Sequence, residues 1–187
     1  MTCILGVDGG ASGTTASIVD EMGCVRGVGH AGSANPLAIS LDRSVGNVSS
    51  AVGEALVLAG ATLNDVRAAA FCLSGVGDEG DTVRVQLGES IAAKIPLSCP
   101  VHIDHDAIAA HVGAFLGSTG VIVIAGTGAI GFAVDSQGVR YRADGWGGWI
   151  GDEGSRFWIG MEGLKASFRA HDGRGEPTSF FQCCSLH

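Results

Sequence analysis

The sequence lacks the features that mark several large protein classes. No apolar run is long enough to cross a bilayer, because glycine or a charged residue interrupts each candidate. No basic segment precedes the short apolar stretch at the N-terminus, and Asp8 comes too early for a secretory signal peptide. Lys and Arg number 11 against 19 Asp and Glu, a formal net charge of −8 that argues against a general binder of nucleic acid or anionic membranes. We therefore expect a cytoplasmic protein with no nucleic-acid and no membrane partner.

Cysteine is present, but no CxxC pair occurs. The six cysteines are scattered, and four of them lie in apolar, strand-like surroundings, where a free thiol behaves as a small hydrophobic group. This pattern predicts a reduced protein. It argues against a zinc or iron–sulfur site within one chain, while a cluster shared between subunits stays open.

Glycine is abundant, with 31 residues and no collagen-like period, which indicates many tight loops. A chain of 187 residues can bury one core, or one domain and part of another. Short apolar runs alternate with stretches of helical periodicity, so we expect an α/β fold. The expected strands are residues 3–7, 16–19, 25–28 and 68–73, and the expected helices are residues 41–59, 82–93, 107–115 and 155–168.

A glycine-rich turn joins two apolar runs in residues 121–134, VIVIAGTGAIGFAV. The β-branched run 121–124 predicts a strand that is buried on both faces. Gly126 and Gly128 allow backbone amides to approach a ligand closely, and Thr127 adds a hydroxyl, which suits a phosphate group. The alternative is a plain hairpin whose glycines serve only its geometry.

The same turn matches the GxGxxG pattern of dinucleotide-binding proteins. Such a turn opens a helix, and an acidic residue follows about 20 positions further on. Here the glycines lead instead into a second apolar run, a DSQG turn and another strand-like run at residues 139–141. Without a helix N-terminus to receive a pyrophosphate, the pattern argues against a Rossmann site.

A second candidate phosphate loop, DGGASGTT, follows the first expected strand. Asp8 at the end of that strand is placed to hold a magnesium ion, through water. An ordinary glycine turn is the alternative for either loop taken alone. Two such loops in one chain favour the phosphate interpretation.

The segment VHIDHD, residues 101–106, is the chemically densest part of the chain. A transition-metal site is one interpretation, but in a strand His102, Asp104 and Asp106 share one face while His105 points away. A more economical interpretation starts a helix at Asp106, beyond the end of a strand, where ligands collect in open α/β sheets. A carboxylate there can act as a general base toward a substrate hydroxyl; capping of the helix is the alternative, and one aspartate can do both.

Two further segments are candidates for a polar ligand. In GSANP, Pro36 restrains Asn35 to an extended backbone, and the Asn35 amide is then available to a ligand; a helix-entry turn is the alternative. Residues 143–155, ADGWGGWIGDEGS, suit neither a strand nor a helix. Tryptophan beside polar groups presents an apolar wall to a sugar, and the alternative is core tryptophan with acids that cap the next helix.

The order of motifs resembles that of a known family. GVDGGASGTT, GSAN, LSGVG, the Asp106–Ala107 pair, IAGTGAIG and GWGGWIGDEGSRFWIG are similar to motifs of the BadF/BadG/BcrA/BcrD-type ATPase and N-acetylglucosamine kinase family, within the actin-like sugar-kinase superfamily. The resemblance covers residues 1–168 and implies ribonuclease-H-like α/β domains with a mixed sheet and with ATP and magnesium in the cleft between them. These are residues 1–117 and an incomplete second domain, 118–172, followed by an irregular tail, 173–187.

The resemblance also implies roles for single residues. Asp106 matches the catalytic base, which takes the proton of the sugar hydroxyl that attacks the γ-phosphate. Phosphoryl transfer depends mostly on positioning and charge neutralisation, so the absence of GxxxxGK[ST] is no objection. Phosphate contacts are implied for Gly9, Gly10, Ser12, Thr14, Gly126, Thr127 and Gly128, and sugar contacts for Asn35, Gly75, Trp146, Gly147 and Asp152.

Three hypotheses follow for function. The leading one is ATP-dependent phosphorylation of the 6-hydroxyl of N-acetylglucosamine or glucosamine. The second, an ATPase activator of a dehydratase, needs cysteines that bridge an iron–sulfur cluster, and none lies near the glycine loops. The third is a non-catalytic sugar- or nucleotide-binding remnant, because the adenosine motif of the family has no counterpart here. The expected partner is a small amino sugar, and a homodimer is compatible with the sequence.

Overall fold

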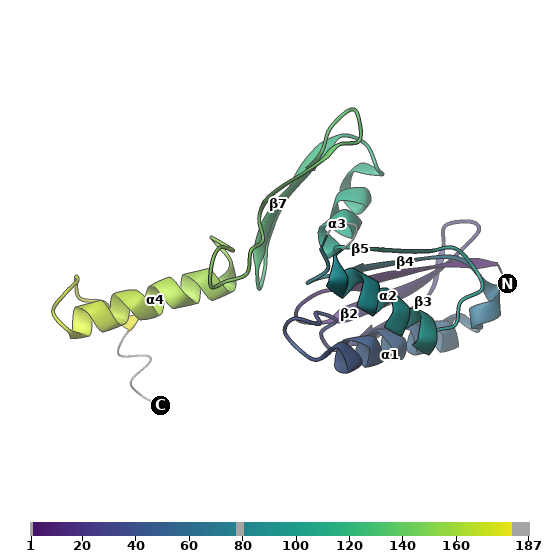
Figure 1. Ribbon diagram of the computed structural model, residues 1–187, viewed down its shortest axis with the longest axis horizontal. Coiled ribbons are helices and arrows are strands. Elements are labelled where there is room, and N and C mark those ends of the chain that lie inside the picture. The colour runs from purple at the N-terminus through teal and green to yellow at the C-terminus, as the bar shows by residue number, and fades with distance from the viewer. Residues whose placement is uncertain (1, 78–80, 181–187) are drawn as a thin grey trace. The chain divides into compact units, whose positions relative to one another are not determined.

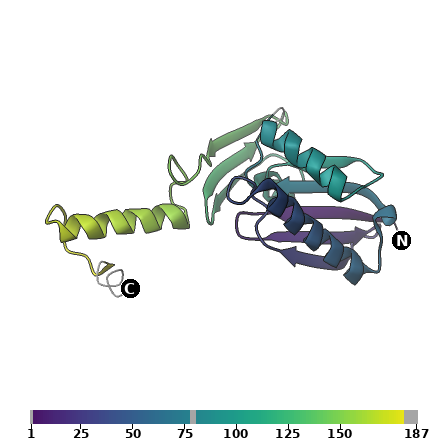
Figure 2. The ribbon, with the colours of Figure 1, turned by 60° about the horizontal axis from the view of Figure 1, so that its bottom comes forward.

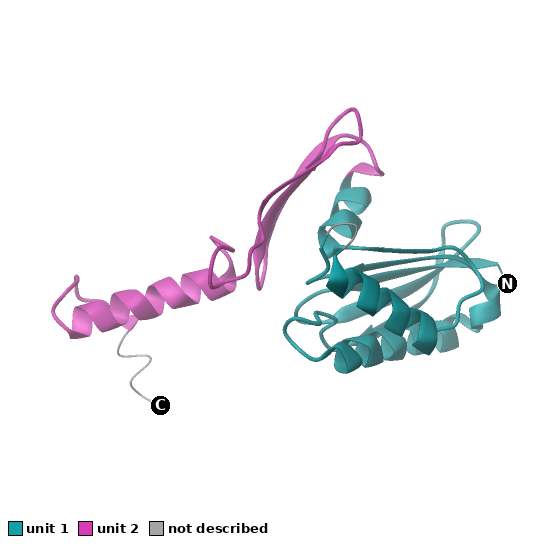
Figure 3. Cartoon of the chain, in the orientation of Figure 1, with its two compact units in different colours: residues 1–114 teal, residues 115–187 magenta. Residues whose placement is uncertain are grey.

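The computed structural model describes residues 2–77 and 81–180. The chain forms two compact units, Met1–Ala114 and Phe115–His187 (Figure 3). No helix within the described ranges is long and apolar enough to cross a membrane. The cysteines in these ranges, Cys3, Cys24, Cys72 and Cys99, are free thiols; Cys24 is exposed, whereas Cys3 and Cys72 are buried.

Unit 1 contains a five-stranded mixed sheet with the strand order β3-β2-β1-β4-β5 (Figure 1). Strand β1 pairs antiparallel with β2 and parallel with β4; β2 pairs antiparallel with β3, and β4 pairs parallel with β5. The predicted α/β fold with a mixed sheet is confirmed. The strands are β1 (Cys3–Gly9), β2 (Thr14–Asp20), β3 (Val25–Ala31), β4 (Val66–Leu73) and β5 (Val101–Asp104).

Helices α1 (Leu41–Ala59) and α2 (Thr82–Lys94) cover one face of this sheet (Figure 2). Alternate β1 side chains enter the core, and α1 adds an apolar stripe at helical spacing. Each fully buried aliphatic or aromatic side chain contributes roughly 1.5–3 kcal/mol. The largest fully buried apolar side chains are Phe71, Leu5, Ile18, Leu73, Leu87, Ile91, Val48 and Val52.

Small residues set where α1 lies and where it ends. A side chain on Gly29 would collide with the carbonyl oxygen of Ala51, and one on Gly27 with that of Ala55, so both glycines allow α1 to lie directly on β3. Gly60 ends the helix with φ 62° in the left-handed region. The predicted range 41–59 is confirmed. A short 3₁₀ helix, η1 (Leu63–Asp65), then leads into β4.

Helix α3 (Asp106–Phe115) follows β5 after a single residue. Its buried residues are Ala107, Ile108 and His111. The prediction that Asp106 begins a helix beyond a strand end is confirmed. The alternative arrangement, with His102, Asp104 and Asp106 on one face of a strand, is wrong because β5 ends at Asp104.

Unit 2 begins with an antiparallel sheet in the order β6-β7-β8, formed by β6 (Gly120–Ala125), β7 (Ala129–Val134) and β8 (Arg140–Asp144). The strand–turn–strand prediction is confirmed. The prediction that residues 121–124 are buried on both faces is wrong: Val121 is 68% and Val123 is 78% exposed. Side chains alternate along this edge strand, and nothing in the described part of the chain covers its valine face.

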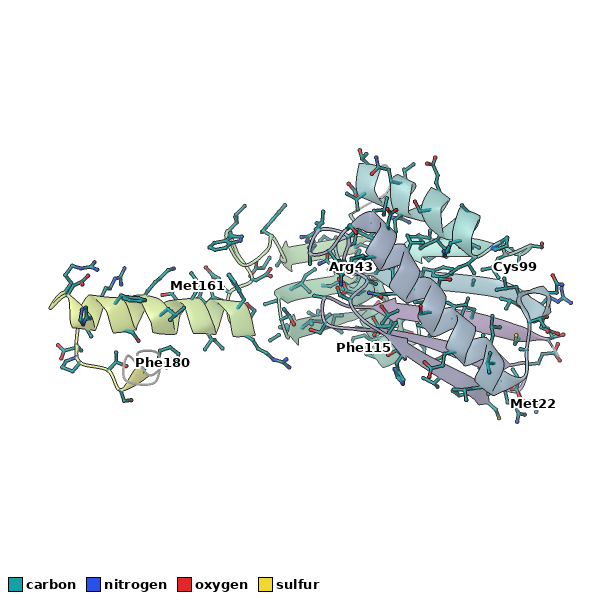
Figure 4. The ribbon with its side chains drawn as sticks, turned by 90° about the horizontal axis from the view of Figure 1, so that it is seen from below. Met22, Arg43, Cys99, Phe115, Met161 and Phe180 are labelled. Carbon is teal, nitrogen blue, oxygen red and sulfur yellow. The ribbon has the colours of Figure 1, made fainter. Side chains whose placement is uncertain are left out.

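Helix α4 (Arg156–His171) ends the regular structure of unit 2. The Ser155 hydroxyl caps it by accepting a hydrogen bond from the backbone N–H of Trp158 at 3.1 Å. Side chains project from α4 on opposite sides in Figure 4, and Ile159 and Phe168 are more than half exposed. Of the predicted irregular tail, residues 173–179 contain no helix or strand, and residues 181–187 lie outside the described residues.

Candidate functional site

The carboxyl ends of the parallel strands in unit 1 bring acidic side chains together. The strand register places Asp8 of β1 beside Cys72 of β4, and Cys72 beside Asp104 of β5. Asp106 follows at the start of α3. Burial and the surrounding carboxylates of Asp104, Asp8 and Asp106 raise the pKa of the Cys72 thiol to about 11. The negative charges of three elements therefore converge on this edge of the sheet.

Asp106 combines partial burial with a neighbouring negative charge. Loss of hydration is the main cause that raises its pKa, and the charge on Asp8 raises it further; a hydrogen bond from the Ala107 amide acts in the opposite direction. Asp8 itself is exposed, yet the strand ends around it remove enough hydration to raise its pKa as well. Both carboxylates are thus held with less solvation than an ordinary surface aspartate.

Asp104, by contrast, is a buried structural carboxylate with an exposed fraction of 1%. It lies 3.2 Å from His102 Nε2 and 3.9 Å from Arg84 Nη1, and it accepts a hydrogen bond from the His105 backbone at 2.9 Å. Across the residues that the structure describes, no group of three or more His, Cys, Asp or Glu side chains has the geometry of a metal site. Asp104 therefore fixes the turn that leads to Asp106.

The first glycine loop is a tight hairpin beside the acidic pair. The Gly10 amide donates to the Gly13 carbonyl at 2.8 Å, so the hairpin itself uses that amide. A side chain on Gly9 would collide with Leu73 and approach Ala34 Cβ to 2.6 Å. Thr14 is 2% exposed, and its hydroxyl donates to the Gly32 carbonyl at 2.7 Å; Ser12 is exposed.

Two predicted sugar contacts, Asn35 and Gly75, lie against each other next to this hairpin. Gly75 has φ 78°, and a side chain on it would collide with Asn35 Oδ1. The same oxygen accepts a hydrogen bond from the Leu37 amide at 2.9 Å, so the helix-entry turn proposed for this segment is present. The Ala34 amide donates to the Gly10 carbonyl at 3.1 Å, which ties the Asn35 loop to the glycine hairpin.

Ser74 belongs to the same region, and the sequence analysis missed it. Its backbone N–H donates to the Gly9 carbonyl at 2.7 Å. Its hydroxyl is buried and finds no hydrogen-bond partner among the described residues. A buried hydroxyl of this kind is available to a polar ligand. The signal in the sequence was its place in LSGVG, directly after a strand.

The second glycine loop lies in unit 2, where it is tied to the start of α4. The Gly126 amide donates to the Gly128 carbonyl at 2.8 Å, and the Gly126 carbonyl accepts from the Arg156 amide at 3.0 Å. Thr127, at the tip, is exposed. The hairpin alternative and the phosphate interpretation both fit this geometry.

Asp152 and Gly147, both predicted sugar contacts, meet at this second loop. Asp152 Oδ1 accepts a hydrogen bond from the Gly147 amide at 3.1 Å. Its Oδ2 lies so close to Gly128 that a Cβ there would stand 2.6 Å from it. The structure therefore brings together Gly128, Gly147 and Asp152.

The tryptophans of this segment are on the surface of unit 2. Trp146 is 69% and Trp149 is 84% exposed, so the alternative of core tryptophans is wrong. The Arg142 guanidinium lies 5.0 Å from the centre of the Trp146 ring, a cation–π contact. Trp149 packs edge-to-face on Phe157 at 5.4 Å between ring centres. Both tryptophans therefore remain largely exposed despite these contacts.

Asp144 is a second residue that the sequence analysis left without a role. Its carboxylate accepts hydrogen bonds from the backbone of Gly145, Asp152 and Glu153, at 2.7–2.9 Å. These bonds, that from Asp152 first, lower the pKa of Asp144. The only sequence signal was its position directly before a glycine-rich loop.

Comparison with known proteins identifies what the chain is similar to. The profile of the BadF/BadG/BcrA/BcrD ATPase family matches residues 5–183. The N-acetylmuramic acid/N-acetylglucosamine kinase of Clostridium acetobutylicum is 43% identical over 74 residues, 40% of this chain and 24% of that protein. The N-acetyl-D-glucosamine kinase of Dictyostelium discoideum is 30% identical over 95% of this chain and 58% of its own length.

Among solved structures, the putative N-acetylglucosamine kinase of Chromobacterium violaceum superimposes with a TM-score of 0.82 and 26% identity. That match covers 98% of this chain and 63% of the solved chain. The predicted actin-like sugar-kinase fold is thereby confirmed. The chain spans less than two thirds of the length of these relatives.

Proposed function

Because the chain belongs to the BadF/BadG/BcrA/BcrD ATPase family, we propose that it serves the ATP-dependent phosphorylation of an amino sugar. The substrates would be N-acetylglucosamine or glucosamine, and the acceptor the 6-hydroxyl. The names of the Clostridium and Dictyostelium relatives support this substrate class.

The observation that carries the proposal is the pair Asp8 and Asp106 at the carboxyl ends of the parallel strands. Burial raises the pKa of both carboxylates, and the charge on Asp8 raises that of Asp106 further; perturbed groups of this kind cluster at functional sites. The Gly9–Gly10 hairpin, Asn35 and Ser74 surround the same edge. This edge is where open α/β sheets bind their ligands.

Asp106 is the general base in this proposal. Its carboxylate takes the proton of the sugar 6-hydroxyl as that oxygen forms a bond to the γ-phosphorus and the bond from phosphorus to ADP breaks. A raised pKa makes the ionised carboxylate a stronger proton acceptor than an ordinary aspartate. The position of Asp106 on the first turn of α3 limits where its carboxylate can accept that proton.

The residues of the first loop fit a nucleotide phosphate and a magnesium ion. Gly9 leaves no room for a side chain against the buried Leu73 and Ala34, so glycine lets the hairpin lie directly on the core. A single exposed carboxylate such as Asp8 suits magnesium, which keeps most of its waters and is held through them. Bound there, magnesium neutralises phosphate charge. Thr14 would act through the shape of the loop, because its hydroxyl already donates to Gly32.

The proposed sugar contacts are described within each unit by itself. Unit 1 contributes the adjoining Asn35 and Gly75, and unit 2 contributes Gly147, Asp152 and the exposed Trp146. Carboxylate and amide groups can orient sugar hydroxyls by hydrogen bonds, while an indole face packs on the apolar face of the ring. The phosphate contacts proposed for unit 2 are Gly126, Thr127 and Gly128.

The test is ADP release from ATP and magnesium in a coupled assay, with N-acetylglucosamine, glucosamine or glucose as acceptor. We expect turnover with an amino sugar, and an Asp106→Asn variant with kcat lower by about 10²–10⁴-fold, the usual contribution of a general base. Asp135→Asn, which changes a surface carboxylate in the β7–β8 turn, is the matched control and should retain activity.

The results separate the three hypotheses. Turnover that needs a sugar and is lost in Asp106→Asn supports the kinase. Thermal stabilisation by a sugar, without ADP release, would instead support a binding protein without catalysis. ADP release that no sugar stimulates, in a brown, iron-containing protein, would support the ATPase activator.

A further inference from the structure

The loop between β8 and α4 is organised around one carboxylate. Asp144 is the last residue of β8 and has φ 65°, in the left-handed region that residues other than glycine seldom adopt. This conformation turns the chain sharply away from the sheet. Gly145, the next residue, also has a positive φ, of 76°. The chain here is shaped by something other than its intrinsic preferences.

Hydrogen bonds across the loop account for that shape. Asp144 Oδ1 accepts from the Gly145 amide at 2.8 Å and from the Asp152 amide at 2.7 Å, and Oδ2 accepts from the Glu153 amide at 2.9 Å. The first of these amides lies at the beginning of the loop and the other two at its end. One side chain therefore closes the whole loop.

Neighbouring residues pack closely around Asp144 and form hydrogen bonds with it. A side chain on Gly151 would collide with Asp144 Oδ1, so glycine is needed there for the bonds to form. The Asp144 carbonyl accepts from Arg142 Nε at 3.0 Å, and the same Arg142 stacks on Trp146. The carboxylate closes the loop, and the carbonyl of the same residue holds the arginine under the indole.

The closed loop determines where Asp152 lies. The Asp152 amide is held by Asp144, and Asp152 itself has φ 58°. Its own carboxylate is thereby directed to the Gly147 amide and to the face of Gly128 in the second glycine hairpin. The Asp152 carbonyl also accepts from the Ser155 amide at 3.0 Å, which ties it to the start of α4, whereas the bond to Asp144 ties the Asp152 amide to the beginning of the loop.

We propose that Asp144 is a positioning residue for sugar recognition: it closes the 144–153 loop and so places Asp152 and Trp146 for the substrate. This inference rests on the proposed function, because it assigns the loop to the amino sugar. Asp144 itself contacts no substrate in this account. It acts through the geometry of the residues that do.

The chain contains a matched control in Asp135. Its Oδ1 accepts hydrogen bonds from the Gln137 amide at 2.8 Å and the Val139 amide at 2.9 Å, and its Oδ2 accepts from the Tyr141 hydroxyl at 2.9 Å. Asp135 therefore closes the β7–β8 turn much as Asp144 closes the loop after β8. Loss of either carboxylate removes the same kind of bond.

Three variants at position 144 separate the effect of the carboxylate from that of the backbone conformation. Asp144→Gly removes the acceptor but accepts the positive φ. Asp144→Ala removes the acceptor and also resists the positive φ. Asp144→Asn keeps one acceptor oxygen, and so the bonds to Gly145 and Asp152, and is the conservative variant should the others fold poorly. We compare each with wild type and Asp135→Asn, all as the 187-residue chain.

Two readouts are measured on every variant: hydrogen exchange at the amides of Asp152 and Glu153, and the KM and kcat for N-acetylglucosamine and glucosamine. We expect Asp144→Gly to exchange faster at these amides and to raise the sugar KM about tenfold or more, with the KM for ATP unchanged. Asp144→Asn should lie between Asp144→Gly and wild type. Asp135→Asn should leave the exchange of the Asp152 and Glu153 amides unchanged, and the sugar KM as well.

Unchanged exchange in Asp144→Gly would contradict the proposal that Asp144 closes the loop. Faster exchange with an unchanged sugar KM would overturn the positioning role, because the loop would then be closed for stability alone. A wild-type chain that neither binds nor phosphorylates these sugars overturns the proposed function and, with it, the link to sugar. The exchange data need no substrate, so they show separately whether Asp144 closes the loop.

Discussion

The negative charge on Asp8 raises the pKa of Asp106, although the two residues lie at opposite ends of the sequence of unit 1. Parallel pairing of β1 with β4, and of β4 with β5, brings their strand ends to one edge of the sheet. Among the described residues, neither carboxylate forms a salt bridge that would offset the charge of the other. Their proximity therefore has measurable effects on stability and on pH dependence.

Asp106→Asn should make the folded chain more stable at pH 7. Folding raises the pKa of Asp106, so the ionised carboxylate destabilises the folded state at any pH above the folded value. That cost disappears as the pH falls below the value in the unfolded chain, and asparagine never carries it. Thermal unfolding at pH 7 and at acidic pH should show a higher Tm for the variant only at pH 7. A less stable variant at pH 7 would contradict the assignment of burial as the main cause.

Asp8→Asn should move the acidic limb of the pH profile of kcat/KM to lower pH. The base must be ionised, so the rate falls as the pH drops through the pKa of Asp106. Removal of the Asp8 charge lowers that pKa and leaves the base ionised to a lower pH. Measurements at saturating magnesium separate this shift from weaker metal binding. Asp135→Asn, which removes a distant carboxylate, should leave the limb in place.

Gly75→Ala should weaken both the fold and the binding of sugar. The residue has φ 78°, and the added methyl group would collide with Asn35 Oδ1. A non-glycine residue in this region costs roughly 1–2 kcal/mol in stability. Gly60→Ala is the control, because Gly60 has φ 62° but open space around it. Both variants should lose stability, whereas a raised sugar KM is expected for Gly75→Ala alone. Equal sugar KM values for the two variants would show that Asn35 does not contact the sugar.

Gly29→Ala should destabilise unit 1 by about 1–3 kcal/mol, the usual cost of forcing an extra group into a packed interior. The methyl group would collide with the Ala51 carbonyl of α1, and helix and strand would have to separate. Gly53→Ala, on the exposed side of α1, meets no atom within 4 Å and should be neutral or slightly stabilising. Urea unfolding of both variants measures the difference, and equal midpoints would show that α1 can shift without cost.

Local patterns predicted most of the elements of this fold. The α1 range followed from apolar residues at helical spacing, and the hairpin at residues 121–134 from its glycines between two apolar runs. The start of α3 at Asp106 followed from a polar residue after a strand. These features depend on a few consecutive residues, which a sequence displays directly.

Exposure and loop geometry could not be predicted in the same way. The run of residues 121–124 indicates a strand, but how much of it is buried depends on what packs against it, and Val121 and Val123 are exposed. The role of Asp144 depends on amides up to nine residues away and on positive φ values at Asp144 and Asp152. Likewise, the burial of Thr14 depends on the distant Gly32 carbonyl.

Cys72 and Cys24 differ in exposure, and this difference allows selective labelling of unit 1. Cys72 is buried and its pKa is raised to about 11, so at neutral pH it is a protonated thiol that alkylating reagents reach poorly. Cys24, in the turn between β2 and β3, is exposed. With the half-buried Cys99 replaced by serine, and with it Cys183 and Cys184, which lie outside the described residues, a maleimide fluorophore or spin label would attach at Cys24. Unit 1 would then carry a spectroscopic reporter on a turn at the opposite ends of β1 and β2 from the Asp8–Asp106 pair.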